Sequence, residues 1–291
     1  MSTLLKTVDK NVVRLTMNIL ITGTTSGIGW ETAIELAKRN CNLFLANRSK
    51  EKTDALIRQI TKIAPQVKVI YLPIELDDLQ SVKDAATQFL ALKEPLDLLI
   101  NNAGILGKKG LTKDGYEVAF GTNHLGHFLL TQLLRPALLK SPTPRILNLA
   151  SNAHRSAEFH GWDDLRTPTK SEAGYPEYGF SKVCNMLHVQ EIAQREEYQG
   201  VTAYSVHPGV ILTEIWRHTS PPATLVATTP FLKDANEGCQ NTLFCAFTKD
   251  NFPNGSFIVS KKPSDVSEMV KDKHLQKELW EFSMKAVQAY L

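Results

Sequence analysis

The sequence predicts an α/β fold in which a doubly wound, about seven-stranded parallel sheet carries helices on both faces. Short apolar runs rich in β-branched residues recur along the chain, helix-period segments separate them, and a glycine-rich turn follows the first run. This alternation is typical of parallel sheets, because each parallel strand needs a crossover connection. We expect a single domain over residues 1–291, with its core at 17–260, because no low-complexity linker divides the chain.

The apolar runs are expected to form the strands. Most of them are almost continuously apolar rather than alternating, which is typical of strands buried on both faces of a sheet. In chain order they are Met17–Ile21, Cys41–Ala46, Val67–Leu72, Leu96–Ile100, Arg145–Leu149, Val201–Val206 and Ser256–Val259.

The segments between these runs have the apolar spacing of helices. Apolar residues recur at i, i+3, i+4 and i+7 in stretches that begin at Trp30, Leu130 and Phe180. Two regions, 152–177 and 210–234, depart from the alternation and read as long loops. Ligands of open α/β sheets bind beyond the carboxyl ends of the strands, so we expect these loops to wall a substrate pocket.

Composition excludes several classes of protein. The net charge of +3 and the dispersed Lys and Arg residues argue against nucleic-acid binding. The four cysteines lack C-x-x-C spacing and lie in apolar segments, so we expect no metal site and a reducing, cytoplasmic location. The N-terminal segment has no continuous apolar stretch of the signal-peptide kind, and no run of about 18 apolar residues predicts a membrane span. We therefore expect a soluble protein.

The glycine-rich turn TGTTSGIG, residues 22–29, leads from the first expected strand into the helix near Trp30. Gly23 allows a tight turn, Gly27 lets the backbone approach a pyrophosphate, and Gly29 lets helix and strand pack closely. The start of a helix also offers free N–H groups and a positive dipole to phosphates. The turn therefore predicts a dinucleotide site in a Rossmann fold.

Five motifs stand in one register along the chain. T-G-x3-G-x-G is followed by NNAG at 101–104, Asn123, Ser151 with Tyr178-x-x-x-Lys182, and HPG at 207–209. In order and position they resemble the short-chain dehydrogenase/reductase family over nearly the whole chain. The segments GTNHLGHFLLTQLL, SKVCN and HPGV are most similar to its branch of retinol dehydrogenases, WW-domain oxidoreductases and protochlorophyllide reductases.

The resemblance implies a catalytic set of Asn123, Ser151, Tyr178 and Lys182. Tyr178 and Lys182 are one helical turn apart and share a face. The tyrosine would exchange a proton with the substrate oxygen. The lysine, with an oxidised nicotinamide nearby, would lower the pKa of that phenol, and it would bind the nicotinamide ribose. Ser151 would donate a hydrogen bond to the reacting oxygen, and Asn123 would hold a water that links Lys182 to solvent. The family usually has a second serine where this chain has Ala150.

The resemblance also implies a set of cofactor contacts. The turn would cradle the pyrophosphate, the NNAG segment would pass the adenosine end, and the HPGV segment would cover the nicotinamide. Glu75 stands where the family more often has an aspartate near the adenine. The full set is Gly23, Thr25, Ser26, Gly27, Ile28, Gly29, Arg48, Lys50, Glu75, Leu76, Asn102, Ala103, Gly104, Tyr178, Lys182, Pro208, Gly209, Val210 and Thr213.

The end of the second expected strand bears on the choice of cofactor. NAD-specific relatives carry an acidic residue there that binds the ribose hydroxyls. Here the strand ends Asn47-Arg48-Ser49-Lys50, with two cations and no anion. This favours NADP(H) over NAD(H), although a solvated Arg–Lys pair at a helix start would look the same.

Aromatic residues in the two long loops indicate an apolar substrate pocket, for which His154, Trp162 and Trp216 are the candidates. Loop aromatics can equally serve as local anchors. The predicted substrate is a lipophilic small molecule with a carbonyl or alcohol group, of retinoid, steroid or aromatic-ketone type.

Two other functions stay open at this point. One is a catalytically silent nucleotide-sensing or interaction protein on the same fold, and the other is a double-bond reductase of the protochlorophyllide type. A homodimer is also possible, because helices around Leu130 and Phe180 form the usual dimer surface of the family.

Overall fold

An eight-stranded sheet runs through the protein in the order β3-β2-β1-β4-β5-β6-β7-β8. The computed structural model describes residues 16–209, 215, 217–219 and 235–291. All neighbouring strands are parallel except the pair β7 and β8. The strands are β1 (Asn18–Thr22), β2 (Asn42–Asn47), β3 (Val69–Pro73), β4 (Leu98–Asn101), β5 (Arg145–Leu149), β6 (Thr202–His207), β7 (Phe257–Val259) and β8 (Lys262–Pro263).

Each predicted apolar run is a strand, with its ends shifted by at most two residues. The additional strand, β8, has only two residues, and both are exposed. No apolar run marks β8 in the sequence, because this short antiparallel edge buries neither of its side chains. The strand order 3-2-1-4-5-6 is that of the doubly wound dinucleotide-binding fold, so the predicted fold class is confirmed.

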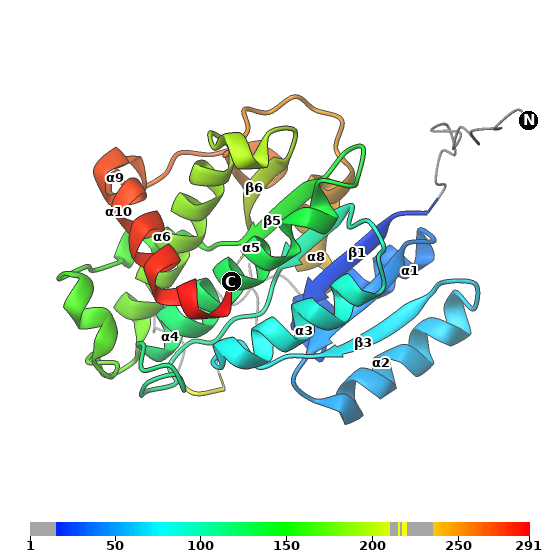
Figure 1. Cartoon of the computed structure of the whole chain (residues 1–291), viewed down its shortest axis with the longest axis horizontal. Helices are drawn as coiled ribbons and strands as arrows, with labels where there is room; N and C mark the ends of the chain where they lie inside the picture. The colour runs from blue at the N-terminus through cyan, green and yellow to red at the C-terminus, as the bar shows by residue number, and fades with distance from the viewer. Residues whose placement is uncertain (1–15, 210–214, 216, 220–234) are drawn as a thin grey trace, which may run out of the picture.

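Helices cover both faces of the sheet (Figure 1). One face packs against α1 (Gly27–Lys38), α2 (Lys50–Ile63) and α8 (Ala235–Phe247). The other packs against α3 (Leu79–Ala91), α5 (Gly126–Leu138), α6 (Tyr175–Ile192) and α10 (Lys273–Val287). The shorter helices are α4 (Val118–Phe120), the π-helical turn η1 (Gly121–Leu125), η2 (Asn152–Ser156), η3 (Trp162–Arg166), η4 (Glu196–Tyr198), α9 (Glu268–Lys271) and η7 (Gln288–Tyr290).

The strands alternate strictly between the two cores. Ile19 and Ile21 of β1 belong to one buried cluster, whereas Leu20 belongs to the other. Successive side chains of a strand point to opposite faces, so an all-apolar strand supplies both layers at once. This two-sided burial is why the runs in the sequence are continuous rather than alternating.

The C-terminal helix α10 lies along α6 (Figure 1) and extends the core beyond the predicted boundary at residue 260. Its Trp280 packs edge-on against Phe128 at 5.0 Å between ring centroids, and the Arg195 guanidinium lies 3.8 Å above the same indole. Within the described residues, no helix combines the length and apolarity needed to cross a bilayer.

Candidate active site

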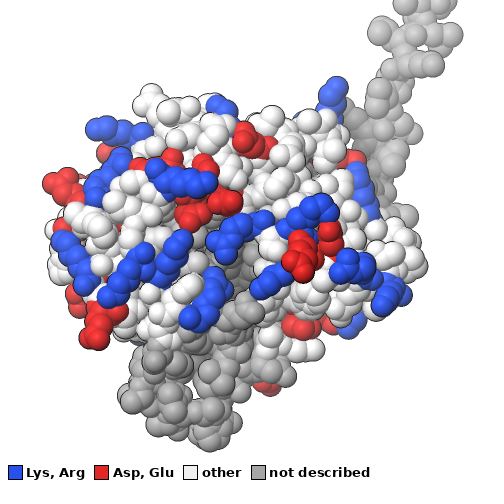
Figure 2. Space-filling view, turned by 90° about the horizontal axis from the view of Figure 1, so that it is seen from below, with Lys and Arg blue, Asp and Glu red and all other residues white. Residues whose placement is uncertain are grey.

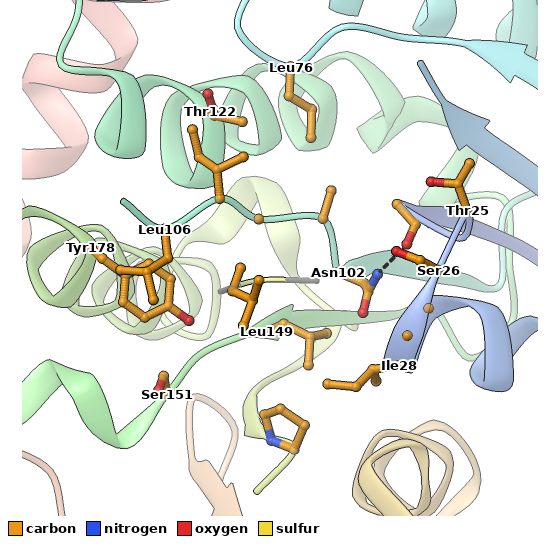
Figure 3. A pocket seen from close by; sticks show the side chains of 18 of the residues that line it. Thr25, Ser26, Ile28, Leu76, Asn102, Leu106, Thr122, Leu149, Ser151 and Tyr178 are labelled. Atoms are coloured by element: carbon orange, nitrogen blue, oxygen red, sulfur yellow. Dashed lines mark hydrogen bonds between the residues drawn. The ribbon is translucent and has the colours of Figure 1, made fainter. Parts of the chain in front are cut away.

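A cavity of about 950 Å³ opens at the carboxyl ends of the strands. Residues that follow β1, β2, β3, β4, β5 and β6 all contribute to its walls, although these segments are far apart in the sequence. Figure 3 shows Tyr178 and Ser151 at one end, Thr25 and Ser26 at the other, and Asn102 between them. The predicted glycine turn and the predicted catalytic residues thus lie at opposite ends of one cavity.

The glycine turn has the backbone geometry that its residues predict. Gly23 and Gly27 adopt φ values of +71° and +56°, which disfavour any side chain. A Cβ on Gly29 would lie 2.2 Å from the Gly23 carbonyl oxygen, so only glycine lets α1 approach the turn this closely. The turn is therefore built for close packing of strand, loop and helix.

The start of α1 is open to the cavity. Ser26 is its N-cap residue, yet the serine side chain makes no capping hydrogen bond. By contrast, the side chains of Ser49 and Asp78 cap α2 and α3. The first N–H groups of α1, with Ser26 and Ile28 lining the cavity, remain available to an anion. A dinucleotide pyrophosphate fits this site.

The NNAG segment is attached to the end of β1. The backbone N–H groups of Asn102 and Ala103 both donate to Thr22 Oγ1, at 3.0 Å each. The Asn102 side-chain amide donates to the carbonyl oxygens of Thr22 and Gly23, at 2.7 and 3.0 Å. Asn102, Ala103 and Gly104 all line the cavity, as predicted for cofactor contacts.

Tyr178 and Ser151 are brought together by a close approach of α6 to η2. Gly179 makes this possible, because a Cβ at that position would lie 2.6 Å from the Ala153 carbonyl oxygen. The Ser151 hydroxyl then lies near the Tyr178 phenol and acts to lower the pKa of that phenol. Both residues line the cavity (Figure 3).

Lys182 lies one turn further along α6 and is buried. Its Nζ is 5.3 Å from the centroid of the Tyr178 ring and donates to the Leu149 carbonyl oxygen at 3.0 Å. Burial lowers the pKa of Lys182 to about 8, so the ammonium form still predominates at neutral pH.

The protein alone does not lower the pKa of Tyr178, and the lowering expected with an oxidised nicotinamide nearby stays a prediction. Enclosure by protein raises the pKa of Tyr178, and the Ser151 hydroxyl offsets this only in part. The reason is geometric: the Lys182 ammonium lies over the ring and bonds to Leu149, so desolvation of the phenolate dominates. The phenol is therefore protonated at neutral pH and able to donate.

Asn123 is fully buried in η1 and holds the segment that follows NNAG. Its Oδ1 accepts from the Ile105 N–H at 2.8 Å, and its Nδ2 donates to the Ile105 carbonyl oxygen at 3.0 Å and to Ser181 Oγ at 2.9 Å. A Cβ on Gly104 would lie 3.5 Å from both Asn123 Oδ1 and Lys182 Nζ. The amide and the ammonium therefore converge on Gly104.

Positive side chains gather where the second strand ends. Arg48 and Lys52 line the cavity there, joined by Lys108 and Arg217 from other loops. Figure 2 shows Lys and Arg side chains in a broken band across this side of the molecule. Lys50, a predicted contact, instead pairs with Asp54 at 2.7 Å and does not line the cavity. Its helix position turns it to solvent, and Lys52 faces the cavity in its place.

Two predicted substrate-pocket residues lie elsewhere. His154 is buried against Phe257, with Nδ1 3.0 Å from Ser267 Oγ, and Trp162 stacks on Phe282 at 4.9 Å. Neither lines the cavity. Both side chains instead anchor the 152–177 region to the C-terminal part of the chain, the alternative that the sequence left open for loop aromatics.

The other predicted contacts divide into two groups. Glu75, Leu76, Pro208 and Gly209 line the cavity, and Lys113 Nζ lies 3.6 Å from Glu75 Oε2. Val210, Thr213 and Trp216 lie outside the described residues.

Sequence reasoning missed several cavity residues, among them Lys52 and Lys108. Tyr175 is one of the aromatics of the 152–177 region that the sequence offers for the pocket, and it lines the cavity about one turn before Tyr178 on the same helix. Within the described ranges, no cluster of three or more His, Cys, Asp or Glu side chains is suited to a metal ion.

Comparison with known proteins agrees with this geometry. The family model for short chain dehydrogenase matches residues 17–162. Retinol dehydrogenase 12 of Mus musculus is 38% identical over 91% of this chain and 84% of its own length. A protein from Mycobacterium paratuberculosis has a similar structure, with a TM-score of 0.75, 30% identity, and coverage of 94% of this chain and 93% of its own. A short chain dehydrogenase from Burkholderia cenocepacia, in complex with NADP, has a TM-score of 0.67 at 23% identity, with coverage of 84% and 96%.

The doubly wound fold and the dehydrogenase relatives define an oxidoreductase of the α/β class. The chain belongs to the short-chain dehydrogenase family, and its retinol dehydrogenase relatives confirm the predicted branch.

Proposed function

We propose that this protein is an NADP-dependent oxidoreductase that acts on the carbonyl or alcohol group of a lipophilic small molecule. The observation that carries the proposal is the shared cavity, in which Ser151 and Tyr178 face the same space as the glycine turn. When bound, a nicotinamide would supply or accept the hydride. Gly23, Ser26 and Ile28 would hold its pyrophosphate.

In the reducing direction, the Tyr178 phenol would donate its proton to the substrate oxygen. Its raised pKa keeps that proton in place at neutral pH. The Ser151 hydroxyl would donate a hydrogen bond to the same oxygen and stabilise its developing charge. The buried Lys182 ammonium would stabilise the phenolate left behind, because the charge lies 5.3 Å from the ring centroid at a position with little exposure to solvent.

Asn123 would act on the backbone rather than on the substrate. Its amide holds Ile105 from both sides, which keeps Gly104 beside Lys182. A water that links Lys182 to solvent could also be bound here, and this part of the family pattern stays a prediction.

NADP is the proposed form of the cofactor because of the charge around Arg48. Among the described residues, four positive side chains line the cavity near the end of β2. The acids of this described part of the wall, Glu75 and Asp77, are each within 4 Å of a lysine. A 2′-phosphate would bind favourably to such a cluster, and Arg48 offers a planar, multi-donor group for it.

The lipophilic substrate class rests on the cavity wall near Tyr178. Leu106, Leu149 and Tyr175 line the cavity together with Tyr178. Apolar walls with a few polar groups at the reacting end are typical of sites for small apolar ligands.

A substrate screen tests the proposal. Retinoids, steroids, aromatic aldehydes and quinones are offered with NADPH or NADH, and cofactor oxidation is followed with wild type and with Tyr178→Phe. We expect NADPH-dependent reduction of at least one lipophilic carbonyl and its loss in the variant. Tight NADPH binding without turnover of any compound would instead support the nucleotide-sensing alternative. Reduction of a ring double bond with no carbonyl turnover would support the protochlorophyllide-type alternative.

A further inference from the structure

Thr22 Oγ1 has three hydrogen-bond partners at the end of β1. It accepts from the N–H groups of Asn102 and Ala103, and it lies 2.9 Å from His127 Nε2. A hydroxyl oxygen has two lone pairs and one proton. The two N–H donors occupy the lone pairs, so the hydroxyl proton points to His127 Nε2.

This arrangement defines the state of the His127 ring. Nε2 accepts the hydrogen bond from the Thr22 hydroxyl and therefore carries no hydrogen, so the imidazole is neutral with its hydrogen on Nδ1. Nδ1 lies 2.9 Å from the Asn123 carbonyl oxygen, which can only accept. Each ring nitrogen thus has the partner that this tautomer requires. Complete burial agrees with a neutral ring, because it lowers the pKa of His127 to about 4.

The two partners of His127 hold opposite ends of one loop. Thr22 binds the backbone of Asn102 and Ala103, and Asn123 binds the backbone of Ile105 on both its N–H and its carbonyl. This loop lines the cavity between the glycine turn and Tyr178. His127 therefore links the two residues that hold the ends of the 102–105 backbone. It contacts the hydroxyl of Thr22 and the backbone carbonyl of Asn123, whose side chain binds Ile105.

We propose that His127 is a positioning residue that sets the 102–105 loop against the bound cofactor through its Nδ1–H tautomer. The residue touches neither cofactor nor substrate and acts only through Thr22 and Asn123. Its effects on NADPH affinity and on turnover rest on the proposed function, whereas its tautomer does not.

The two hydrogen bonds of His127, from Thr22 to Nε2 and from Nδ1 to Asn123, can be removed separately by substitution. Each of them is called an arm of the bridge below. The amide of asparagine occupies roughly the place of Nδ1, and the amide of glutamine that of Nε2. His127→Asn can therefore still donate to the Asn123 carbonyl but loses Thr22. His127→Gln can still accept from Thr22 but loses Asn123, and His127→Phe loses both arms.

The experiment measures NADPH affinity by calorimetry and the single-turnover rate of the full chain for each variant. We expect His127→Phe to lower both by about tenfold or more, because two buried polar groups lose their partner. His127→Gln should keep NADPH affinity within about threefold of wild type and lower the single-turnover rate. His127→Asn should lower the affinity and keep the single-turnover rate. Thr22→Val should weaken affinity as His127→Asn does, because it breaks the same arm.

His124→Phe is the matched control. His124 is equally buried on the same helical segment, but its Nε2 contacts Ser283 Oγ at 2.9 Å, away from the loop. This variant should lose stability without a change in NADPH affinity. Equal losses of affinity in His124→Phe and His127→Phe would reduce the role of His127 to packing and overturn the proposal.

A second measurement needs no variant. Nitrogen-15 NMR of histidine-labelled wild type should show a protonated Nδ1 and an unprotonated Nε2 for His127, whose ring is assigned by its through-space contacts with Thr22. The opposite tautomer would overturn the proposal even if every His127 variant failed to fold. Absence of turnover in wild type, with the expected tautomer present, would count against the proposed function and not against the bridge.

Discussion

Asn47 and Thr24 are joined by two hydrogen bonds of 2.7 Å, from the Thr24 N–H to Asn47 Oδ1 and from Asn47 Nδ2 to Thr24 Oγ1. Asn47 Nδ2 also donates to Thr53 Oγ1 at 3.1 Å. The asparagine at the end of β2 thus ties the glycine turn to α2. Replacing it with aspartate would disturb this link as well as add charge, so the cofactor preference is better tested at Arg48.

Arg48→Ala is expected to weaken NADPH binding by about tenfold to a hundredfold, because a charge-assisted hydrogen bond contributes about 1.5–3 kcal/mol. NADH binding should be nearly unchanged. Lys50→Ala is the control, since Lys50 pairs with Asp54 outside the cavity and should affect neither cofactor. The measurement is kcat/KM for both cofactors, and an equal loss for both would remove Arg48 from phosphate recognition.

Tyr178→Phe is expected to retain cofactor binding and lower the rate of reduction by about a hundredfold or more, the size of a lost general acid. The ring packing beside Tyr175 stays, because only the hydroxyl is removed. Single-turnover kinetics with saturating NADPH measure the rate, and calorimetry measures the binding. A rate within a few-fold of wild type would rule out Tyr178 as the proton donor.

Ser151→Ala is expected to lower activity by about tenfold to a thousandfold, because a hydrogen bond to the reacting oxygen is lost. Ser151 Oγ also accepts from the Ala153 N–H at 3.2 Å as the cap of η2, so about 1 kcal/mol of stability should be lost as well. Ala150→Ser is the control and should stay active, since adjacent residues of an extended chain point in different directions. Full activity in Ser151→Ala would show that the serine only caps η2.

Lys182→Met is expected to stabilise the cofactor-free protein by about 1–3 kcal/mol at neutral pH, because burial lowers the pKa of Lys182 from 10.5 to about 8. Below pH 8 Lys182 is protonated in both the folded and the unfolded state, and the folded state carries the full free-energy cost of burying the ammonium. Between pH 8 and 10.5 the unfolded state holds more protons, so wild-type stability rises and the gain in the variant should shrink. Denaturant unfolding at several pH values measures this. A gain that grows with pH would contradict it.

His188→Phe is expected to flatten the acid side of the stability profile. Burial is the main cause that lowers the pKa of His188 to about 3, while an unfolded histidine titrates near 6.5. The unfolded state therefore binds one more proton as pH falls from 6.5 toward 3, and stability is lost in that window. Removing this group should reduce the slope of unfolding free energy by about 1.4 kcal/mol per pH unit. Urea titrations from pH 7 to 5 measure it, with the exposed His274→Phe as control; identical slopes for both variants would refute the assignment.

The sequence by itself determined the strands β1 to β7, their buried character, the glycine turn and the family. These features are local, since a strand needs only a continuous apolar run and Tyr178 and Lys182 share a face because they are one turn apart. Motif order along the chain then specified the family, which comparison confirmed. The roles of the individual site residues stay predictions until the variants above are measured.

Only the tertiary structure decided which side chains reach the cavity and which tie loops together. His127 bonds to a residue 105 positions away, and His154 to one 113 positions away. Lys52 faces the cavity and Lys50 does not, because α2 packs on the sheet through Thr53, Leu56 and Ile60 and this sets the direction of each turn. Polar side chains in loops and at helix starts take their orientation from such distant partners. The spacing of residues along the chain does not predict these partners.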